Sequence, residues 1–307
     1  MQREVVVLGG NGFLGTNLCE ALWKNSIKPI VLDKSLGCDL AVDDGQQIFK
    51  DVLENLNDID NIDVVMMAAN VGSQLFENDP LSPYYENKAI NDKCIDTMMN
   101  FANPTSKFHV TFYSTSEVYG NIDPLSVPCK LMPTIDPSYS RSLYSQEKLV
   151  VETLLNHLEN FGKISSLRIF RPFNVSGKWQ KRGVLFKMVE SAIKQGEVEY
   201  AANQTREITF VQDATDQALS MIMSRKSGTY DLTSKNHILL KDLAYSVKCI
   251  LNEMNPFLKI NLVEMNPGCC YIKTRGTTKL MNSSDDLVSF IKLLKQHNTI
   301  SDIADAI

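Results

Sequence analysis

Short apolar runs alternate with stretches of helical periodicity from the amino terminus of this 307-residue chain. Glu4–Leu8 is a valine-rich run, and Phe13–Trp23 spaces its apolar residues as a helix does. Further apolar runs follow, with amphipathic stretches between most of them: Pro29–Leu32, Val64–Ala69, Val110–Tyr113 and Ile164–Phe170. Apolar runs separated by helices are typical of a parallel sheet that is covered on both faces. The pattern therefore predicts a doubly wound α/β domain.

The character of the sequence changes after Pro172. Only short strand candidates lie between the stretches with helical spacing, which are Arg182–Lys194, Asp213–Ser224, Leu240–Asn252 and Asp286–Lys295. We predict that residues 1–172, joined by residues 212–232, form the doubly wound domain, and that residues 173–307 form mainly a smaller α/β domain. No low-complexity linker separates the two, so a cleft between them is the expected ligand site.

Composition excludes several classes of protein. The chain is 44% apolar and 22% charged, near the globular norm, so disordered and collagen-like chains are excluded. Its formal charge of −5 and the lack of a long basic run argue against nucleic-acid binding. Seven scattered cysteines and four histidines suggest neither a disulfide framework nor a metal site. No segment approaches the ~20 apolar residues that span a bilayer, so we expect a cytoplasmic protein.

A glycine-rich turn follows the first predicted strand. The segment Gly9–Gly15 reads GGNGFLG; glycine suits it because the turn needs positive φ and because Cβ atoms would keep a pyrophosphate from the backbone. The helix that begins near Phe13 directs free N–H groups and its positive dipole end to the same place. Asp33 ends the second predicted strand, where a carboxylate accepts both ribose hydroxyls of NAD and repels the 2′-phosphate of NADP. These features predict an NAD site.

Two further motifs carry side chains suited to proton transfer. Tyr144 and Lys148 are four residues apart at the start of a predicted helix, so they lie on one face of it. A neighbouring ammonium favours the phenolate, which a tyrosine needs in order to act as a base. Ser114–Gly120 reads STSEVYG and follows the run Val110–Tyr113, so its hydroxyls are expected at the carboxyl end of a central strand, where ligands bind.

In this order, the motifs resemble those of the nucleotide-sugar epimerase/dehydratase family, the extended branch of the short-chain dehydrogenase/reductase superfamily. The resemblance covers nearly the whole chain and includes Met66–Ala69 (MMAA) on the fourth strand and Arg171–Val175 (RPFNV). It implies a Rossmann-type doubly wound parallel sheet that binds NAD. It also implies a smaller C-terminal α/β domain that binds the substrate.

The resemblance implies roles for individual residues. Thr115 would hydrogen-bond the substrate oxygen being oxidised, Tyr144 would be the base, and Lys148 would hold the nicotinamide ribose and lower the pKa of Tyr144. Glu117 is a further candidate for acid/base work. The residues implied in cofactor binding are Gly9, Gly12, Phe13, Leu14, Gly15, Asp33, Asp39, Leu40, Ala68, Tyr144 and Lys148. Those implied in substrate binding are Thr115, Ser116, Asn174 and Arg206.

The family's shared first step is hydride transfer from a sugar hydroxyl, usually at C4, to NAD. Dehydratases of the family carry an Asp-Glu pair after the threonine, whereas this chain has Ser116 and Glu117, so dehydration is disfavoured. We therefore expect a nucleotide-sugar enzyme that forms a 4-keto sugar, with a 4-dehydrogenase or 4-epimerase outcome. Surface-polysaccharide or related glycan synthesis is the expected pathway.

Two alternatives stay open beside this reading. One is a UDP-glucuronate-type decarboxylase, because the string Thr115–Gly120 is similar in that group, although Glu147 before Lys148 is unusual there. The other is a non-catalytic regulator that binds NAD. Such relatives usually lose the tyrosine or the lysine, and this chain has both Tyr144 and Lys148.

The resemblance also implies an assembly. Pro83–Asn103 and Tyr139–Asn160 are expected to form two long helices, with apolar residues at helical spacing such as Ile90, Cys94, Ile95, Met98 and Met99. In the family such helices pair across a two-fold axis into a four-helix bundle, which makes a homodimer. The alternative is that this apolar face packs only against the chain's own sheet. The pair Cys269–Cys270 is interpreted as core packing.

Overall fold

The computed structural model describes residues 3–56, 61–72, 76, 78–101, 107–120, 142–265, 280, 281 and 283–307. Within these ranges the chain divides into two compact units. Unit 1 takes its residues from 1–118, 137–171 and 215–231, and unit 2 from 119–136, 172–214 and 232–307. Among the helices of the described ranges, none combines the length and the apolar character needed to cross a bilayer.

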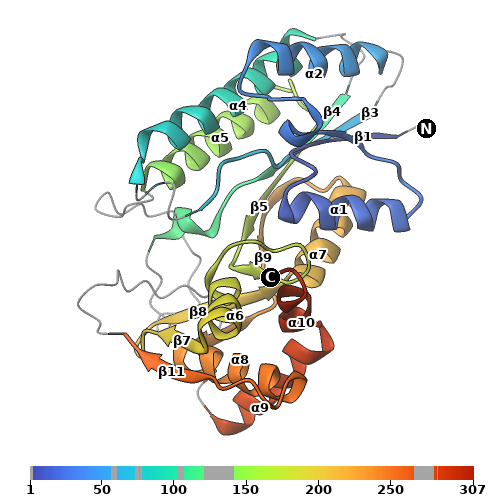
Figure 1. The fold of residues 1–307 in the computed structure, drawn as a ribbon. Coiled ribbons are helices and arrows are strands. Elements are labelled where there is room, and N and C mark those ends of the chain that lie inside the picture. The colour runs from blue at the N-terminus through green and yellow to red at the C-terminus, as the bar shows by residue number, and fades with distance from the viewer. Residues whose placement is uncertain are drawn as a thin grey trace. The chain divides into compact units, whose positions relative to one another are not determined.

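Unit 1 is built on a six-stranded parallel sheet with the order β2-β1-β3-β4-β5-β9 (Figure 1). Its strands are β1 (Glu4–Leu8), β2 (Ile30–Leu32), β3 (Asn61–Met66), β4 (Lys107–Tyr113), β5 (Ser166–Pro172) and β9 (Gly228–Leu232). β1 lies between β2 and β3, so the chain leaves β1 toward one edge of the sheet and later resumes on the other side of it. Ligands of doubly wound sheets bind at such a switch point, outside the carboxyl ends of the strands.

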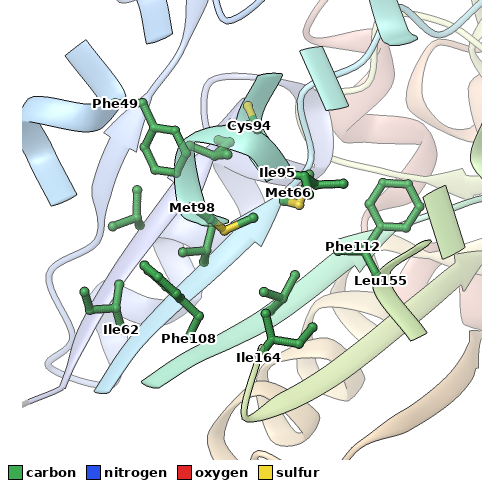
Figure 2. Packing of buried hydrophobic residues seen from close by; sticks show 14 of the residues in the cluster. Phe49, Ile62, Met66, Cys94, Ile95, Met98, Phe108, Phe112, Leu155 and Ile164 are labelled. Atoms are coloured by element: carbon green, nitrogen blue, oxygen red, sulfur yellow. The ribbon is translucent and has the colours of Figure 1, made fainter. Parts of the chain in front are cut away.

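Helices of unit 1 cover the sheet because alternate strand residues are apolar on each face. They are α1 (Phe13–Lys24), α2 (Asp43–Asn55), α4 (Leu81–Asn100), α5 (Ser142–Asn160) and most of α7 (Val211–Ser224), with short 3-10 turns at η1 (Lys34–Leu36) and η2 (Ser116–Tyr119). Figure 2 shows Phe49 of α2, Met98 of α4 and Leu155 of α5 packed over Ile62 and Phe112 of the sheet.

The apolar face of α4 packs against the chain's own sheet. Ile90, Cys94, Ile95 and Met98 are buried in this core, and Met99 packs at its edge. These residues therefore take part in the fold of one chain rather than in a contact between two. The apolar side chains that α4 and α5 expose are others, including Tyr85, Val150 and Leu154.

The strand that ends at Met66 is the third along the chain, not the fourth, and Met67–Ala69 lie beyond it. Only residues 33–42 separate β2 from α2, and η1 occupies part of them. A parallel strand needs a crossover connection of about a dozen residues or more, so this segment is too short to add one.

The other face of the same sheet carries buried charge. Asp63 is fully buried and accepts hydrogen bonds from Arg3 Nε at 2.9 Å and Arg225 Nη2 at 2.8 Å. Arg168, also fully buried, has its Nη2 3.7 Å from Asp63 Oδ1. Arg3 donates as well to the carbonyl oxygen of Ile222 at 2.6 Å, near the end of α7. Because a buried carboxylate needs paired charge, Asp63 fixes the end of α7 to the sheet through these guanidinium groups.

His109 belongs to this buried cluster as a neutral side chain. Its Nδ1 lies 2.8 Å from Ser166 Oγ and its Nε2 lies 3.0 Å from Asn61 Oδ1. Burial, together with the positive charge of Arg225, lowers the pKa of His109 to about 4, although the Asp63 carboxylate acts in the opposite direction. The imidazole is therefore uncharged in the folded protein at neutral pH.

Acidification should cost stability through His109. The unfolded chain binds a proton on this residue below about pH 6.5, whereas the folded chain does so only near pH 4, so stability falls as the pH falls through this window. Between pH 7 and pH 5 the expected loss is about 2 kcal/mol. His109→Gln cannot take up this proton and should lose correspondingly less, as measured by urea unfolding at both pH values. Equal losses in the two proteins would contradict the assignment.

Unit 2 contains two small sheets and four helices within the described residues. The strands β10 (Asn236–Leu239), β8 (Thr205–Phe210) and β6 (Val175–Ser176) form a mixed sheet in that order, and β7 (Glu197–Tyr200) pairs in parallel with β11 (Asn261–Glu264). The helices are α6 (Val184–Gln195), α8 (Leu240–Met254), α9 (Ser284–Gln296) and α10 (Thr299–Ala304). α6, α8 and α9 confirm three of the helices predicted from periodicity, and α7 confirms the fourth. Cys269 and Cys270 lie outside the described residues.

Candidate active site

Close backbone contacts hold the glycine-rich turn at the switch point of the sheet. Gly9 has a φ of +84° and donates its N–H to the carbonyl oxygen of Leu32 at 2.7 Å. A Cβ at Gly9 would lie 2.6 Å from the Cα of Ala68. A Cβ at Gly15 would lie 2.4 Å from the oxygen of Gly9. The packing of the protein itself therefore requires glycine at both positions.

Gly12 differs, because neither its backbone nor its neighbours require glycine. It is the N-cap of α1 with a φ of −71°, and the nearest atom to an added Cβ would be the Gly9 oxygen at 3.3 Å. Gly12 is exposed, provides no capping side chain and precedes the half-buried Phe13 and Leu14. The N-terminus of α1 is thus left bare by its own cap residue, an arrangement that fits the close approach of a pyrophosphate.

Asp33 connects the turn to the end of β2. Its Oδ2 accepts the backbone N–H of Asn11 at 3.0 Å, and its Oδ1 accepts the N–H and the hydroxyl of Ser35 at 2.9 and 2.7 Å. Asn11 also donates its side-chain amide to the Ser35 hydroxyl at 3.0 Å. The carboxylate is half-buried and stands directly beside the glycine turn, where a second negative charge would be repelled.

Asp39 and Leu40, the next two predicted cofactor residues, differ in their surroundings: Asp39 makes a polar contact and Leu40 lies in the core. Asp39 forms an ion pair with Lys34 at 2.7 Å, and the hydrogen bond from this ammonium lowers the pKa of the Asp39 carboxyl. Leu40 is buried in the core of unit 1, and its carbonyl oxygen accepts the amide of Gln46 at 2.6 Å. The position of Leu40 is therefore explained by packing alone.

Ala68 lies against Gly9, on a segment that α4 holds in place. Met67 donates its N–H to the carbonyl oxygen of Leu8 at 2.9 Å, which continues the pairing of β1 and β3. Two residues beyond Ala68, the backbone N–H and carbonyl of Asn70 bond both ends of the Asn87 amide, at 2.6 and 3.0 Å. The fully buried Asn87 was not among the predicted site residues. A polar residue at a core position of a helix is the signal that could have revealed it.

Ser114, Thr115, Ser116 and Glu117 follow the end of β4 and are all buried. Ser114 donates its N–H to the carbonyl oxygen of Phe170 at 2.8 Å, which fixes the start of the segment. The hydroxyl oxygen of Thr115 accepts the N–H of Glu117 at 3.2 Å. A hydroxyl that accepts one hydrogen bond still has its own proton, so Thr115 remains able to donate.

Tyr144 and Lys148 lie on the buried side of α5 (Ser142–Asn160), one turn apart as their spacing predicts. The ring of Tyr144 packs at 5.5 Å between centroids on the ring of Phe76. The Lys148 ammonium is 4.6 Å from the centroid of Phe112 and 5.9 Å from that of Tyr144. Burial lowers the pKa of Lys148, so a proton on this side chain is easier to lose than one in water.

A buried ion pair between Glu152 and Arg171 holds α5 against the sheet. Glu152 of α5 accepts the Nε of Arg171 at 3.0 Å and also bonds its Nη2, and it accepts the hydroxyl of Ser114 as well. The pair joins α5 to the ends of β4 and β5, the two strands nearest the predicted catalytic residues. Glu152 was not predicted as a site residue, and Arg171 only as part of a motif.

Unit 2 carries two predicted substrate residues on its mixed sheet. Asn174 has a positive φ of 34° and donates its amide to the carbonyl oxygen of Glu207 at 2.9 Å. Arg206 is half-buried and donates to the carbonyl oxygen of Thr205 at 2.7 Å and to Gln204 Oε1 at 3.3 Å. Glu207 follows Arg206 on the same strand, so it points to the opposite face.

Comparisons with known proteins are consistent with this arrangement. Residues 5–232 match the model of the NAD dependent epimerase/dehydratase family. The chain belongs to this family. Its members are NAD-dependent nucleotide-sugar enzymes, and the motifs of the glycine turn, β4 and α5 fall inside the matched range.

The proteins that this chain is similar to differ in the reaction and the cofactor that their names give. UDP-glucuronic acid decarboxylase 3 of Arabidopsis thaliana is 26% identical over 281 residues, which cover 86% of this chain and 78% of that protein. The structure of UDP-glucose 4-epimerase from Thermus thermophilus with NAD superposes over 100% of both chains, with a TM-score of 0.73 and 18% identity. RMD from Pseudomonas aeruginosa, solved with NADPH, gives a TM-score of 0.70 over 100% of both chains at 18% identity. The fold of this family is therefore the fold of the chain.

The contrast between Gly15 and Gly12 predicts two different phenotypes. Gly15→Ala should destabilise the protein by about 1–3 kcal/mol, because its Cβ would overlap the Gly9 oxygen. Gly12→Ala should cost about 1 kcal/mol or less, yet it should weaken dinucleotide binding, since the methyl group would stand at the bare end of α1. Thermal unfolding and NAD titration of both variants provide the measurement. If the two variants lose NAD affinity in the same proportion to the free energy of unfolding that each loses, Gly12 has no role beyond the fold.

Proposed function

We propose that the protein is an NAD-dependent nucleotide-sugar enzyme that oxidises the sugar C4 hydroxyl to a 4-keto sugar, with a 4-dehydrogenase or 4-epimerase outcome. The observation that carries the proposal is the ammonium of Lys148 buried beside the ring of Tyr144. An ammonium next to a phenol is useful where the phenol has to give up its proton. A regulator that only binds NAD does not need Tyr144 and Lys148 together, so we favour an enzyme over that alternative.

The residues of unit 1 suit a dinucleotide. The uncapped start of α1 at Gly12 would receive the pyrophosphate, and the carboxylate of Asp33 beside it would receive the adenosine ribose. When bound, NAD supplies the acceptor for the hydride. Asn174 and Arg206 of unit 2 would contact the nucleotide sugar, with the guanidinium of Arg206 suited to a diphosphate.

The chain's own residues would handle the proton. Tyr144 would take it from the sugar hydroxyl as the hydride leaves C4, and Lys148 would stabilise the phenolate by its charge. Thr115 would donate a hydrogen bond to the same sugar oxygen, since its hydroxyl keeps its proton while its oxygen accepts from Glu117. Return of the hydride to the other face of the 4-keto sugar gives an epimer, and release of the keto sugar gives a dehydrogenase.

UDP-glucuronate-type decarboxylation is the second candidate. Its support is the similarity to UDP-glucuronic acid decarboxylase 3 over 86% of the chain. Incubation with a panel of UDP-, GDP- and dTDP-sugars, UDP-glucuronate included, separates the outcomes by mass spectrometry. Loss of two hydrogens means oxidation, an unchanged mass with a new retention time means epimerisation, and loss of carbon dioxide means decarboxylation. An inert protein across the whole panel would speak against the proposal.

Tyr144→Phe should leave folding and NAD binding intact while hydride transfer falls. General-base loss typically costs on the order of 10²–10⁴ in rate. Thr115→Val should be milder, because the base stays in place. Glu117→Gln should still reduce NAD but stall before the final product if Glu117 carries acid/base work after oxidation. Stopped-flow absorbance of NADH with product analysis measures each step, and wild-type turnover in Tyr144→Phe would refute the mechanism.

Asp33 should make the protein prefer NAD over NADP. The 2′-phosphate of NADP would stand against its carboxylate, so Asp33→Ala should narrow the preference while also loosening the contact to Asn11. Asp33→Asn retains the shape and removes the charge, although it also converts one of the two accepting oxygens into a donor. Fluorescence titration with both dinucleotides measures the ratio; equal affinity of the wild type for the two would sink the assignment.

A homodimer through α4 and α5 is the proposed assembly. Its support is the pair of neighbouring helices that expose Tyr85 at 61%, Val150 at 66% and Leu154 at 40%. Large exposed apolar side chains gathered on neighbouring elements are typical of interfaces. Val150→Lys should therefore weaken association. Sedimentation velocity at micromolar concentration tests the dimer, and a wild-type monomer there would exclude it.

A further inference from the structure

Glu147 is a buried carboxylate directly before Lys148 on α5. Its side of the helix is the one that also carries Tyr144, and the residue is only 5% exposed. Oε1 accepts a hydrogen bond from Nδ2 of Asn91 on α4 at 2.6 Å. Oε2 is buried, and no hydrogen-bond partner for it is found in the described part of the chain. A carboxylate in this setting needs a reason, because burying it costs several kcal/mol unless a charge compensates it.

Asn91 holds Glu147 from within a chain of buried amides. Its Nδ2 also donates to the carbonyl oxygen of Asn87 at 3.1 Å, one turn earlier on α4. Asn87 in turn bonds the backbone of Asn70 through both ends of its amide. Both asparagines are at most 1% exposed. The carboxylate is therefore fixed by a rigid connection from the segment after β3, across α4, to α5.

Two carboxylates act on the Lys148 ammonium, and only one of them is already compensated. Burial lowers the pKa of Lys148, while Glu147 and then Glu152 raise it. Glu152 forms its ion pair with Arg171 of β5, so much of its negative charge is cancelled locally. Within the described residues the hydrogen bond found for Glu147 is the one from the neutral amide of Asn91, so no hydrogen-bonded cation there cancels its charge, and this charge acts on the neighbouring Lys148.

In the part of the chain that the structure describes, a further charge that interacts with Glu147 lies on the exposed side of α4. Lys88 senses the Glu147 carboxylate, but Lys88 is half-exposed and paired with Asp92 on its own helix. Water screens a charge in that position, so it neutralises Glu147 weakly. From β4 the neighbour of the Lys148 ammonium is the uncharged ring of Phe112.

We propose that Glu147 is a positioning residue: its buried carboxylate, fixed by Asn91, keeps the Lys148 ammonium charged beside Tyr144 and so favours the phenolate. The use of that phenolate as a base rests on the proposed function. The electrostatic link from Glu147 through Lys148 to Tyr144 does not, and it can be tested without any substrate.

The test is the ultraviolet titration of Tyr144 in the full-length protein. The chain has ten tyrosines, so the curve of Tyr144 is the difference between each protein and the same protein carrying Tyr144→Phe. Glu147→Gln keeps the shape and the acceptor for Asn91 and removes only the charge. We expect the pKa of Tyr144 to rise by about one unit, which means about tenfold less phenolate at neutral pH.

Asp96→Asn is the matched control. It removes a carboxylate from the exposed face of α4 and should leave the titration of Tyr144 unchanged. An unchanged titration in folded Glu147→Gln overturns the inference. Should Glu147→Gln not fold, Asn91→Ala replaces it, because it removes the donor that fixes the carboxylate and favours its charged form. Asn91→Ala is then expected to shift Tyr144 upward as well, and no shift there overturns the inference too.

The pH dependence of hydride transfer gives the second readout. In Glu147→Gln the rate should fall about tenfold at neutral pH and recover at alkaline pH, because only the fraction of phenolate has changed. A rate that falls equally at all pH values indicates a structural role and contradicts the proposal. If the proposed function fails instead, no sugar reduces NAD in the wild type, yet the titration of Tyr144 still responds to Glu147.

Discussion

β1 and β3 run side by side in register. Just beyond their ends the backbones of Gly9 and Ala68 come so close that a Cβ on Gly9 would lie 2.6 Å from the Cα of Ala68. The strand order places the two segments together, since β1 and β3 are neighbours in the sheet. The turn therefore needs a residue without a side chain at Gly9. Gly15 of α1 needs one as well, because a Cβ there would overlap the oxygen of Gly9. The direction of α1 and the place of Asn11 beside Asp33 follow from this close packing.

The sheet of unit 1 handles buried charge differently at its two ends. Toward the start of the strands, Asp63 is surrounded by guanidinium groups, and His109 stays neutral beside them. The guanidinium groups compensate the buried charge of Asp63. Toward the end of the strands, Lys148 sits between aromatic rings with burial working against its charge. At one end the buried charge is compensated by neighbouring groups, and at the other burial opposes the charge of Lys148.

Sequence reasoning reached the elements that depend on local pattern. The apolar runs located β1 and β2, and the spacing of Tyr144 and Lys148 placed both on one face of α5 as found. It left two partners open for the apolar face of α4, a second chain or the chain's own sheet, and Ile90 and its neighbours are found in the chain's own core. Periodicity shows that a face is buried but cannot tell what buries it.

The polar residues of the core were beyond such reasoning. Asn87 and Asn91 bond to groups that are 17 and 56 positions away in the sequence, and these pairings exist only once β3, α4 and α5 have come together. The bounds of β3 were missed for a related reason: Asn61 and Asp63 interrupt its apolar pattern, yet both are buried because distant Arg225 meets them. The local pattern can show that a polar residue occupies a core position, as for Asn87, but it does not show which distant group compensates it.

The carboxylate of Asp33 already accepts hydrogen bonds from the protein itself. All three donors that reach its carboxylate come from the protein, two of them from Ser35. A ribose hydroxyl that bonds this carboxylate therefore replaces a hydrogen bond or shares an oxygen already in use, and the net gain in binding free energy is small. An incoming phosphate meets the full negative charge with no such exchange to offset it. Under the proposed function, Asp33 would therefore act as a filter: it would add little to how tightly a dinucleotide is held and much to which dinucleotide is rejected.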